Sequence, residues 1–239
     1  MSPDGAPPAK PEDRPAKPEA SPASPEASPA ERKQRLRQDL RQRLEALTPE
    51  QRRRRGERVM EHVLALPQLA SARRVFTCLS FGLEVDTWPL VDQLLAQGRE
   101  LFVPRVERGD PQIYVHPYPS PLRTLSFGLR QPLALEAGGT AALAPEDLDD
   151  GLDVALILGL GFDADGYRLG YGAGYFDRFL HARPFPAIGL AYDCQLMDQL
   201  PVEPHDVPMA AVVTESGVHH PAHPAGSPAS PEVPSDQHR

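Results

Sequence analysis

A glycine-rich segment, residues 156–180, carries the most specific chemical signal in the sequence. It reads LILGLGFDADGYRLGYGAGYFDRFL, an apolar run followed by four spaced glycines and a helical pattern. The spaced glycines are Gly166, Gly170, Gly172 and Gly174. They predict backbone conformations that a side chain would forbid, and uncovered N–H groups at a helix start attract phosphate. The alternative is a tight turn without a ligand, since short glycine motifs often occur by chance.

Two charged side chains within this segment suit nucleotide chemistry. Arg168 offers a fork of donors for phosphate oxygens, and Asp177, one turn into the predicted helix, could hold a magnesium ion that bridges them. The spacing excludes two common phosphate loops. A Walker-type loop needs a Gly-Lys pair, which the chain lacks, and a dinucleotide fingerprint needs glycine where Asp177 stands.

The elements that must position these groups are arranged as strands alternating with helices. Leu36, Leu40, Leu44 and Leu47 recur at helical spacing and predict a helix over 31–47, with Lys33 and Arg37 together on its basic face. A capping box at Thr48–Gln51 starts a second helix that runs to about Leu66. The predicted strands are 74–80, 100–106, 113–116, 153–160, 187–192 and 210–214, and a further helix covers 88–97. Strand, helix and strand in this order imply parallel crossovers, with ligands at the carboxyl ends of the strands. We therefore expect an α/β fold with a mostly parallel sheet and two preceding helices.

Composition limits the folded part of the 239-residue chain. Residues 1–30 hold nine of the 29 prolines and residues 217–239 hold five more, with few large apolar side chains in either segment. Such segments cannot bury enough surface to offset the entropy of ordering, so we expect two disordered tails around a single domain over 31–216.

No apolar run is long enough for a membrane span, and the first residues lack the pattern of a signal peptide. We therefore expect a cytoplasmic protein without membrane contact. Two cysteines, Cys78 and Cys194, provide neither a disulfide framework nor a metal cluster, and both are expected in the core.

The formal net charge is −8, yet residues 32–58 carry eleven Lys or Arg against four acids. Such a run can bind nucleic acid, with Arg52–Arg55 as its centre. The preferred interpretation is two amphipathic helices whose arginines partly face an anionic ligand, because no aromatic residues are interleaved and the rest of the chain is acidic.

Taken together, these motifs resemble the 5-formyltetrahydrofolate cyclo-ligase family, also called 5,10-methenyltetrahydrofolate synthetase, over about residues 33–215. The resemblance rests on Lys33-x-x-Leu-Arg37, Glu84-Val-Asp-Thr87, Phe102-Val-Pro-Arg105, Gly161-Phe-Asp163, the segment from Gly166 to Arg178, and His205-Asp206-Val-Pro208. The long glycine segment is the most specific of these. The resemblance implies the three-layer α/β/α fold of the family, which is like that of NagB, RpiA and the CoA-transferases.

The activity implied by the resemblance is an ATP- and Mg²⁺-dependent ring closure. In the family, the formyl oxygen of 5-formyltetrahydrofolate takes the γ-phosphoryl group of ATP, and the N10 nitrogen then attacks the activated carbon. Phosphate leaves, giving 5,10-methenyltetrahydrofolate and ADP. Such chemistry depends on positioning and on neutralising charge rather than on an acid–base pair.

The family pattern also implies roles for individual residues. Those implied for ATP are Lys33, Arg37, Arg168, Leu169, Gly170, Tyr171, Gly172, Ala173, Gly174, Tyr175 and Phe176. Those implied for the folate, with or without a polyglutamate tail, are Leu79, Glu84, Tyr171, Gly172, Ala173, Gly174 and Tyr175. Catalytic roles fall to Lys33, Arg168 and Tyr175, and the Mg²⁺ ligands would be Asp177 and Asp206. Further candidates for the pocket wall are Phe127, Tyr118 and Phe102, with core packing the preferred role for Phe102.

Two other hypotheses stay open at this point. A non-catalytic nucleotide- or phosphate-binding module on the same fold would bind ATP without turnover, and a nucleic-acid binder would use Arg52–Arg55. The joint presence of metal ligands and the folate-side Glu84 favours the enzyme, for which we expect a monomer that binds no nucleic acid.

Overall fold

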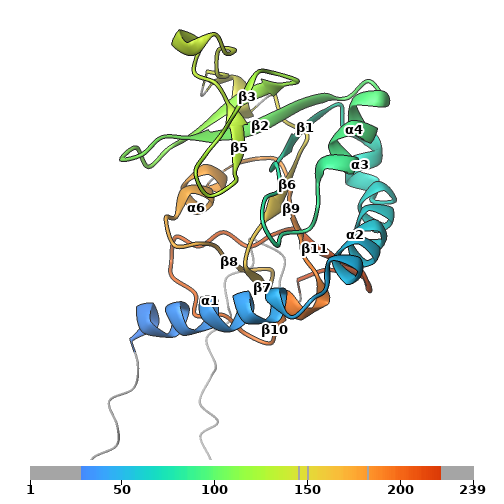
Figure 1. Ribbon diagram of the computed structural model, residues 1–239, viewed down its shortest axis with the longest axis vertical. Helices are drawn as coiled ribbons and strands as arrows, with labels where there is room; N and C mark the ends of the chain where they lie inside the picture. The colour runs from blue at the N-terminus through green and yellow to red at the C-terminus, as the bar shows by residue number, and fades with distance from the viewer. Residues whose placement is uncertain (1–27, 145, 150, 182, 222–239) are drawn as a thin grey trace, which may run out of the picture.

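The computed structural model describes residues 28–144, 146–149, 151–181 and 183–221 (Figure 1). Most of both predicted tails, residues 1–27 and 222–239, lies outside these ranges.

The boundaries of the predicted domain differ from the observed elements at both ends. Helix α1 (Pro29–Glu45) begins two residues before the expected start, and β12 (Gly217–His219) lies within the expected C-terminal tail. β12 pairs antiparallel with β11 (Ala211–Thr214), because the turn at 215–216 returns the chain along the sheet edge.

A seven-stranded sheet forms the centre of the fold, in the order β12-β11-β9-β6-β1-β2-β3. The remaining strands of this sheet are β1 (Arg74–Thr77), β2 (Glu100–Val106), β3 (Ile113–Tyr118), β6 (Val154–Leu158) and β9 (Ala187–Leu190). The five inner strands are parallel, and only the edge strands β3 and β12 run antiparallel to their neighbours. The predicted α/β fold with a mostly parallel sheet is confirmed.

Two small sheets stand beside the main one. β7 (Gly161–Asp163), β8 (Arg168–Leu169) and β10 (Leu196–Met197) form the first, and β4 (Leu122–Thr124) with β5 (Arg130–Pro132) forms an antiparallel hairpin. The predicted strand 153–160 corresponds to β6 alone and ends at Leu158, because the chain then leaves the main sheet and enters the first small sheet at Gly161. The predicted strand 74–80 likewise ends at Thr77.

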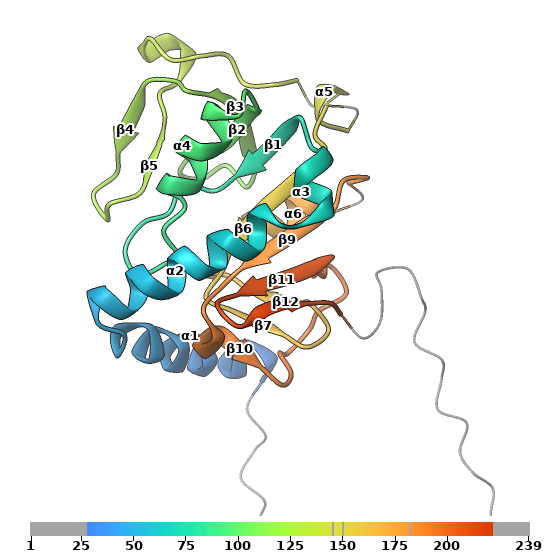
Figure 2. The same cartoon turned by 90° about the vertical axis from the view of Figure 1, so that its right-hand side faces the viewer.

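Helices cover both faces of the main sheet (Figures 1 and 2). The helices are α2 (Pro49–Leu64), α3 (Pro67–Ser71), α4 (Trp88–Ala96), α5 (Glu146–Asp149) and α6 (Tyr175–Leu180), with 3₁₀ turns at Leu135–Ala137 and Asp193–Gln195. α2, α3 and α4 lie on one face and α6 on the other, while α1 crosses the lower end of the molecule in both views. The predicted capping box at Thr48 is present, with its hydroxyl accepting from the N–H of Gln51. Among the described residues, no helix has the length and apolar character needed to span a membrane.

The order of the strands places a topological switch point between β1 and β6. From β1 the chain passes through α4 to β2 on one side, whereas β6, β9 and β11 extend the sheet on the other side. Crevices at such a switch point, at the carboxyl ends of the strands, are where open α/β sheets bind ligands. A ligand site is therefore expected next to the residues that follow β1 and the last residue of β6.

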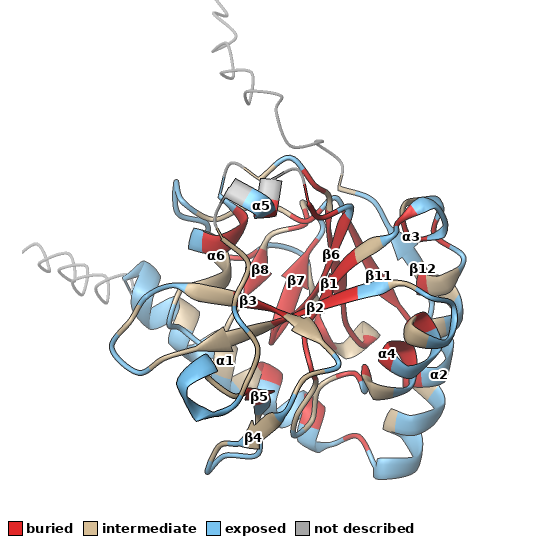
Figure 3. Ribbon diagram, turned by 90° about the horizontal axis from the view of Figure 1, so that it is seen from above, coloured by how far each residue is buried: buried red, intermediate tan, exposed pale blue. Residues whose placement is uncertain are grey.

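The main core lies between the sheet and its helices, where buried residues follow the inner strands (Figure 3). All five residues of β6 are buried, as expected for a parallel strand covered on both faces. A second apolar cluster is separate from this core. It consists of Leu40 from α1, Leu169 from β8 and Leu200, with Leu36 and Met197 packed against it. We call these five residues the satellite cluster.

Candidate functional site

A cavity of about 440 Å³ opens at the switch point of the sheet. Cys78 and Leu79, which follow β1, and Leu158, which closes β6, are part of its lining. Every residue expected to bind nucleotide, folate or metal also lines this cavity: Lys33, Arg37, Leu79, Glu84, Arg168, residues 169–176, Asp177 and Asp206. The fold thus brings together segments that are up to about 170 residues apart in the chain. Their individual roles stay predictions.

The glycine segment follows β8 and ends in α6. Gly166, Gly172 and Gly174 have φ values of +82°, +110° and +66°, so three of the four glycines adopt the left-handed conformation expected for them. Gly170 does not have a positive φ, so a glycine is needed at this position for a different reason. A Cβ atom there would lie 2.5 Å from a guanidinium nitrogen of Arg168, so Gly170 leaves room for the arginine. Gly174 is the N-cap of α6, whose first turn contains Asp177.

Arg168 and Asp177 form an ion pair inside the cavity. The N–O distance is 3.1 Å, and the two side chains are 4% and 16% exposed. The Arg168 guanidinium also lies over the ring of Phe176, 5.2 Å from its centroid. Its Nε is buried without a hydrogen-bond partner. A buried donor without a partner is costly to the folded protein.

α1 contributes two cations to the same wall. The Lys33 ammonium lies 2.6 Å from a carboxylate oxygen of Glu203 and 3.0 Å from one of Asp206. Burial opposes the charge on Lys33, but the hydrogen bonds to both carboxylates outweigh it and raise the pKa of the ammonium. One turn further on, Arg37 donates from Nε to the carbonyl of Gly170 at 2.9 Å. Arg37, rather than Lys33, is therefore the α1 residue that contacts the glycine segment. We call Lys33, Arg37, Arg168, Asp177 and Asp206 the charged wall.

The expected metal ligands line the cavity from two separate segments. Asp206 forms a group with Glu203 and His205 whose ligand atoms lie within 4.8 Å of one another. Asp177 is not part of that group and is paired with Arg168 instead. Carboxylate oxygens are the ligands that Mg²⁺ prefers, so the donors present fit this ion. Glu203 was not anticipated, because a proline-bounded loop gives no periodic pattern that would single it out.

The opposite side of the cavity is lined by aromatic residues. The ring of Phe81 lies 5.6 Å from that of Phe127 and 5.9 Å from that of Tyr171, and the latter two side chains are 60% and 47% exposed. Glu84 lies among them. Its carboxylate accepts from the Tyr171 hydroxyl at 2.9 Å and from the backbone N–H of Phe81 at 3.0 Å. We call Phe81, Glu84, Phe127, Tyr171 and Arg130 the aromatic wall.

Glu84 has an unusual protonation equilibrium. Burial raises its pKa to about 7, although the hydrogen bonds from Phe81 and Tyr171 act in the opposite direction. The same burial raises the pKa of Tyr171 and that of Cys78, the latter to about 12. Cys78 is therefore a protonated thiol, and it is part of both the main core and the cavity lining. Cys194 is only half-buried.

Two of the aromatic candidates do not line the cavity. Phe102 is 5% exposed and belongs to the main core, in agreement with its preferred role. Tyr118 packs against the same core from the edge strand β3 and is absent from the cavity lining, so its proposed place in the pocket wall is wrong. Phe127 does line the cavity. Cys78, Phe81, Arg130 and Gln131 were missed, since their part in the lining depends on contacts between distant elements.

The basic segment of α2 is mostly engaged within the protein. Arg52 donates to the carbonyl of Leu47, Arg53 pairs with Glu50 and Glu57, and Arg55 pairs with Glu215 at 2.9 Å. These contacts favour a structural role for the arginine run.

The chain is similar to several known proteins over most of its length. The model of the 5-formyltetrahydrofolate cyclo-ligase family matches residues 29–215. The chain is 35% identical over 190 residues to a 5-formyltetrahydrofolate cyclo-ligase of Escherichia coli K12, covering 75% of this chain and 98% of that protein. A mouse protein of the same name is 32% identical over 196 residues, covering 77% and 93%. The solution structure of Aquifex aeolicus 5,10-methenyltetrahydrofolate synthetase superposes with a TM-score of 0.66 at 31% identity, covering 86% of this chain and 99% of that one.

Proposed function

Because the chain belongs to the 5-formyltetrahydrofolate cyclo-ligase family, whose named members are ligases, we propose that it converts 5-formyltetrahydrofolate to 5,10-methenyltetrahydrofolate at the cavity, using ATP and Mg²⁺. ATP would supply the phosphoryl group that turns the formyl oxygen into a leaving group. The protein's task is then to hold the two substrates together and to neutralise the transferring charge.

The charged wall suits the nucleotide. Lys33, Arg37 and Arg168 present cations around the glycine segment, whose residues 169–176 would follow the phosphates. Lys33 and Arg168 would neutralise charge on the transferring group. Asp177 and Asp206 would hold Mg²⁺. Binding would then exchange the present ion pairs of Lys33 and Arg168 for ligand contacts.

The aromatic wall suits the folate. Glu84 can accept hydrogen bonds from ring N–H groups of a pterin, and Leu79 offers an apolar surface beside it. Tyr171 to Tyr175 would contact the folate as well as the nucleotide. Tyr175 begins α6 and donates its hydroxyl to the carbonyl of Glu107 at 3.3 Å, which fixes its ring at the cavity.

One observation carries this proposal beyond simple nucleotide binding. The hydrogen bond between Tyr171 and Glu84 connects the glycine segment to a half-buried carboxylate on the opposite side of the cavity. A module that only binds nucleotide needs no such acceptor, whereas a ligase must place a second substrate next to the phosphates.

The test uses purified protein with 5-formyltetrahydrofolate, ATP and Mg²⁺. We expect the near-ultraviolet absorbance of the methenyl product to grow, with one ADP formed per product. Omitting any one component should abolish the signal. If ATP binds but no product forms at saturating substrates, the protein is a nucleotide-binding module and the proposal is wrong.

A further inference from the structure

Arg130 is a cavity-lining cation without a carboxylate partner among the described residues. It lies on β5, outside the segments discussed so far, and its side chain contributes to the cavity rim. Its guanidinium carbon lies 3.5 Å from the centroid of the Trp88 ring. Stacking on an indole face orders a guanidinium while leaving its N–H donors free for a ligand.

The position of Arg130 is fixed by its neighbour in the strand. Gln131 is 1% exposed and binds the backbone of Val106 twice, accepting from its N–H at 3.2 Å and donating to its carbonyl at 3.0 Å. These two bonds attach the β4–β5 hairpin to β2. The backbone of Arg130 is therefore held by its neighbour Gln131, and its guanidinium rests on Trp88, which starts α4.

The other cations of the cavity are already engaged. Lys33 is paired with two carboxylates and Arg168 with one, while Arg37 donates to the carbonyl of Gly170. Arg130 lies instead over the ring of Trp88. Among the described residues it forms no ion pair with a carboxylate, so an anionic ligand group would not have to displace a carboxylate bound to it.

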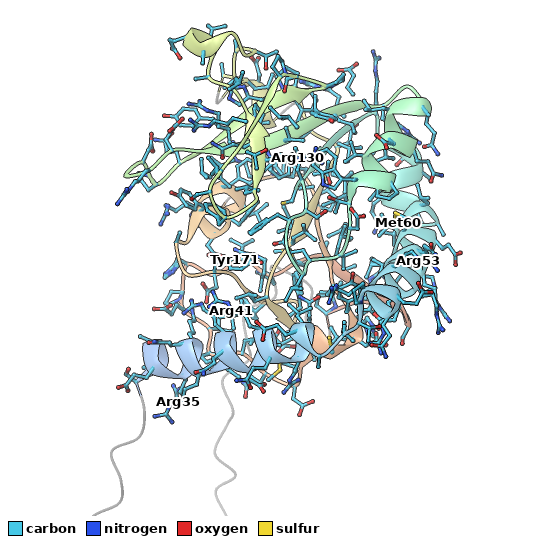
Figure 4. The ribbon with its side chains drawn as sticks, viewed as in Figure 1. Arg35, Arg41, Arg53, Met60, Arg130 and Tyr171 are labelled. Atoms are coloured by element: carbon cyan, nitrogen blue, oxygen red, sulfur yellow. The ribbon has the colours of Figure 1, made fainter. Side chains whose placement is uncertain are left out.

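Arg130 also lies apart from the phosphate-binding elements. In Figures 1 and 2, β5 lies in the upper part of the molecule and α1 at its lower end. Figure 4 shows Tyr171 between Arg130 and α1. An anion at Arg130 would therefore belong to the folate side of the cavity and not to the triphosphate side.

We propose that Arg130 binds a carboxylate of the glutamate tail of the folate and so determines preference for glutamylated substrates. This proposal rests on the proposed function, since it assigns one end of the same substrate. The pterin and the formyl group carry no charge that a guanidinium would need, whereas the tail carries carboxylates. A guanidinium fork holds a carboxylate through two parallel N–H···O bonds, a geometry that an ordered arginine provides at little entropic cost.

The first experiment compares substrates with and without the tail. In Arg130→Gln, the KM for 5-formyltetrahydrofolate should rise about tenfold, the loss of roughly one charge-assisted contact, with kcat unchanged. The KM for 5-formyltetrahydropteroate, which lacks glutamate, should not change. Arg123→Gln is the matched control. It removes an arginine from the same hairpin, one that pairs with Glu107 at 3.2 Å and does not line the cavity, so it should leave both KM values unchanged.

Equal losses for both substrates would overturn the proposal, because Arg130 would then only shape the cavity. An increase in the KM for ATP alone would also overturn it and would place Arg130 on the nucleotide. Arg130→Lys keeps the charge but not the fork, so we expect an intermediate KM for the glutamylated substrate.

The second experiment needs no turnover and therefore separates this proposal from the proposed function. Trp88 is the only tryptophan of the chain, and it touches Arg130 directly. Titration with γ-linked triglutamate should give a saturable change in tryptophan fluorescence that is lost in Arg130→Gln and retained in Arg123→Gln. No saturable change in the unmodified protein, or an equal change in Arg130→Gln, would overturn the proposal even if the methenyl product forms.

Discussion

The charged wall and the aromatic wall enclose the same cavity but are stabilised in different ways. On the charged wall, Lys33 and Arg168 are each neutralised by carboxylates before any ligand is present. On the aromatic wall, Phe127 and Tyr171 expose large parts of their rings to solvent, and Arg130 rests on Trp88. In the proposed reaction, a nucleotide would exchange one ionic partner for another, whereas a folate would gain free energy by covering apolar surface. The two walls should respond differently to substitution.

The largest effect is expected from Asp177→Asn on the charged wall. The change keeps the shape of the side chain but removes the charge that a magnesium ion needs and leaves Arg168 buried without its partner. We expect kcat to fall by about 100-fold or more, measured by formation of the methenyl product. Circular dichroism should show an intact fold. Asp198→Asn, an exposed aspartate outside the cavity, is the control, and an unchanged kcat in Asp177→Asn would contradict its role.

On the aromatic wall, Glu84→Gln should change stability in a pH-dependent way. Burial raises the pKa of Glu84 to about 7 from its ordinary value of 4.5, so the folded state binds this proton more tightly than the unfolded chain. The contribution of Glu84 to stability therefore falls as the pH rises from 4.5 to 7. We expect the free energy of unfolding of Glu84→Gln to equal that of the unmodified protein at pH 4 and to exceed it by about 2 kcal/mol at pH 8. Urea unfolding at both pH values measures this, and an equal difference at both would refute it.

Lys33→Gln should weaken nucleotide binding and slow phosphoryl transfer, without weakening folate binding. We expect the KM for ATP to rise about tenfold with little change in the KM for the folate, since one charge-assisted contact to phosphate is lost. Arg35→Gln is the matched control because Arg35 is exposed on the same helix and points away from the molecule (Figure 4). A rise in the KM for the folate equal to that for ATP would mean that the two walls are not independent.

The smallest effect is expected from Tyr171→Phe, which removes the hydroxyl that donates to Glu84 within the aromatic wall. We expect the KM for the folate to rise about threefold, the value of one neutral hydrogen bond. Because the hydrogen bond from Tyr171 lowers the pKa of Glu84, its loss should also move the pH profile of that KM to higher pH. Tyr167→Phe, outside the cavity lining, should show neither change. An unshifted profile in Tyr171→Phe would show that Glu84 does not titrate in substrate binding.

The charged wall could be predicted from sequence in more detail than the aromatic wall. α1 and the glycine segment carry local signals, namely helical periodicity and spaced glycines, that need no knowledge of tertiary contacts. Arg130 and Gln131 carry none, because their place in the cavity depends on the contact of β5 with β2. The order of the strands was likewise not predictable, since it depends on the long connection between β3 and β6.

Some residues were assigned correctly to the cavity but for an incomplete reason. Gly170 was expected to have a positive φ, yet it provides space for Arg168. Asp206 was expected to bind metal, and it lies beside Glu203 in an ion pair with Lys33 that no local pattern reveals. Sequence patterns specify the backbone conformation of a segment, whereas the partner of each charge is determined by packing.

The satellite cluster has a consequence for how the molecule opens. The half of α1 that carries Lys33 and Arg37 packs through Leu36 and Leu40 in the cluster with Leu169 and Leu200, whereas Leu44 at its other end belongs to the main core. Three segments that are distant in the chain, α1, β8 and the loop around residue 200, thus form one small cooperative unit. This unit can open at a free-energy cost below that of global unfolding, because the main core stays closed. The helix that carries Lys33 and Arg37 can therefore move while the parallel sheet stays folded.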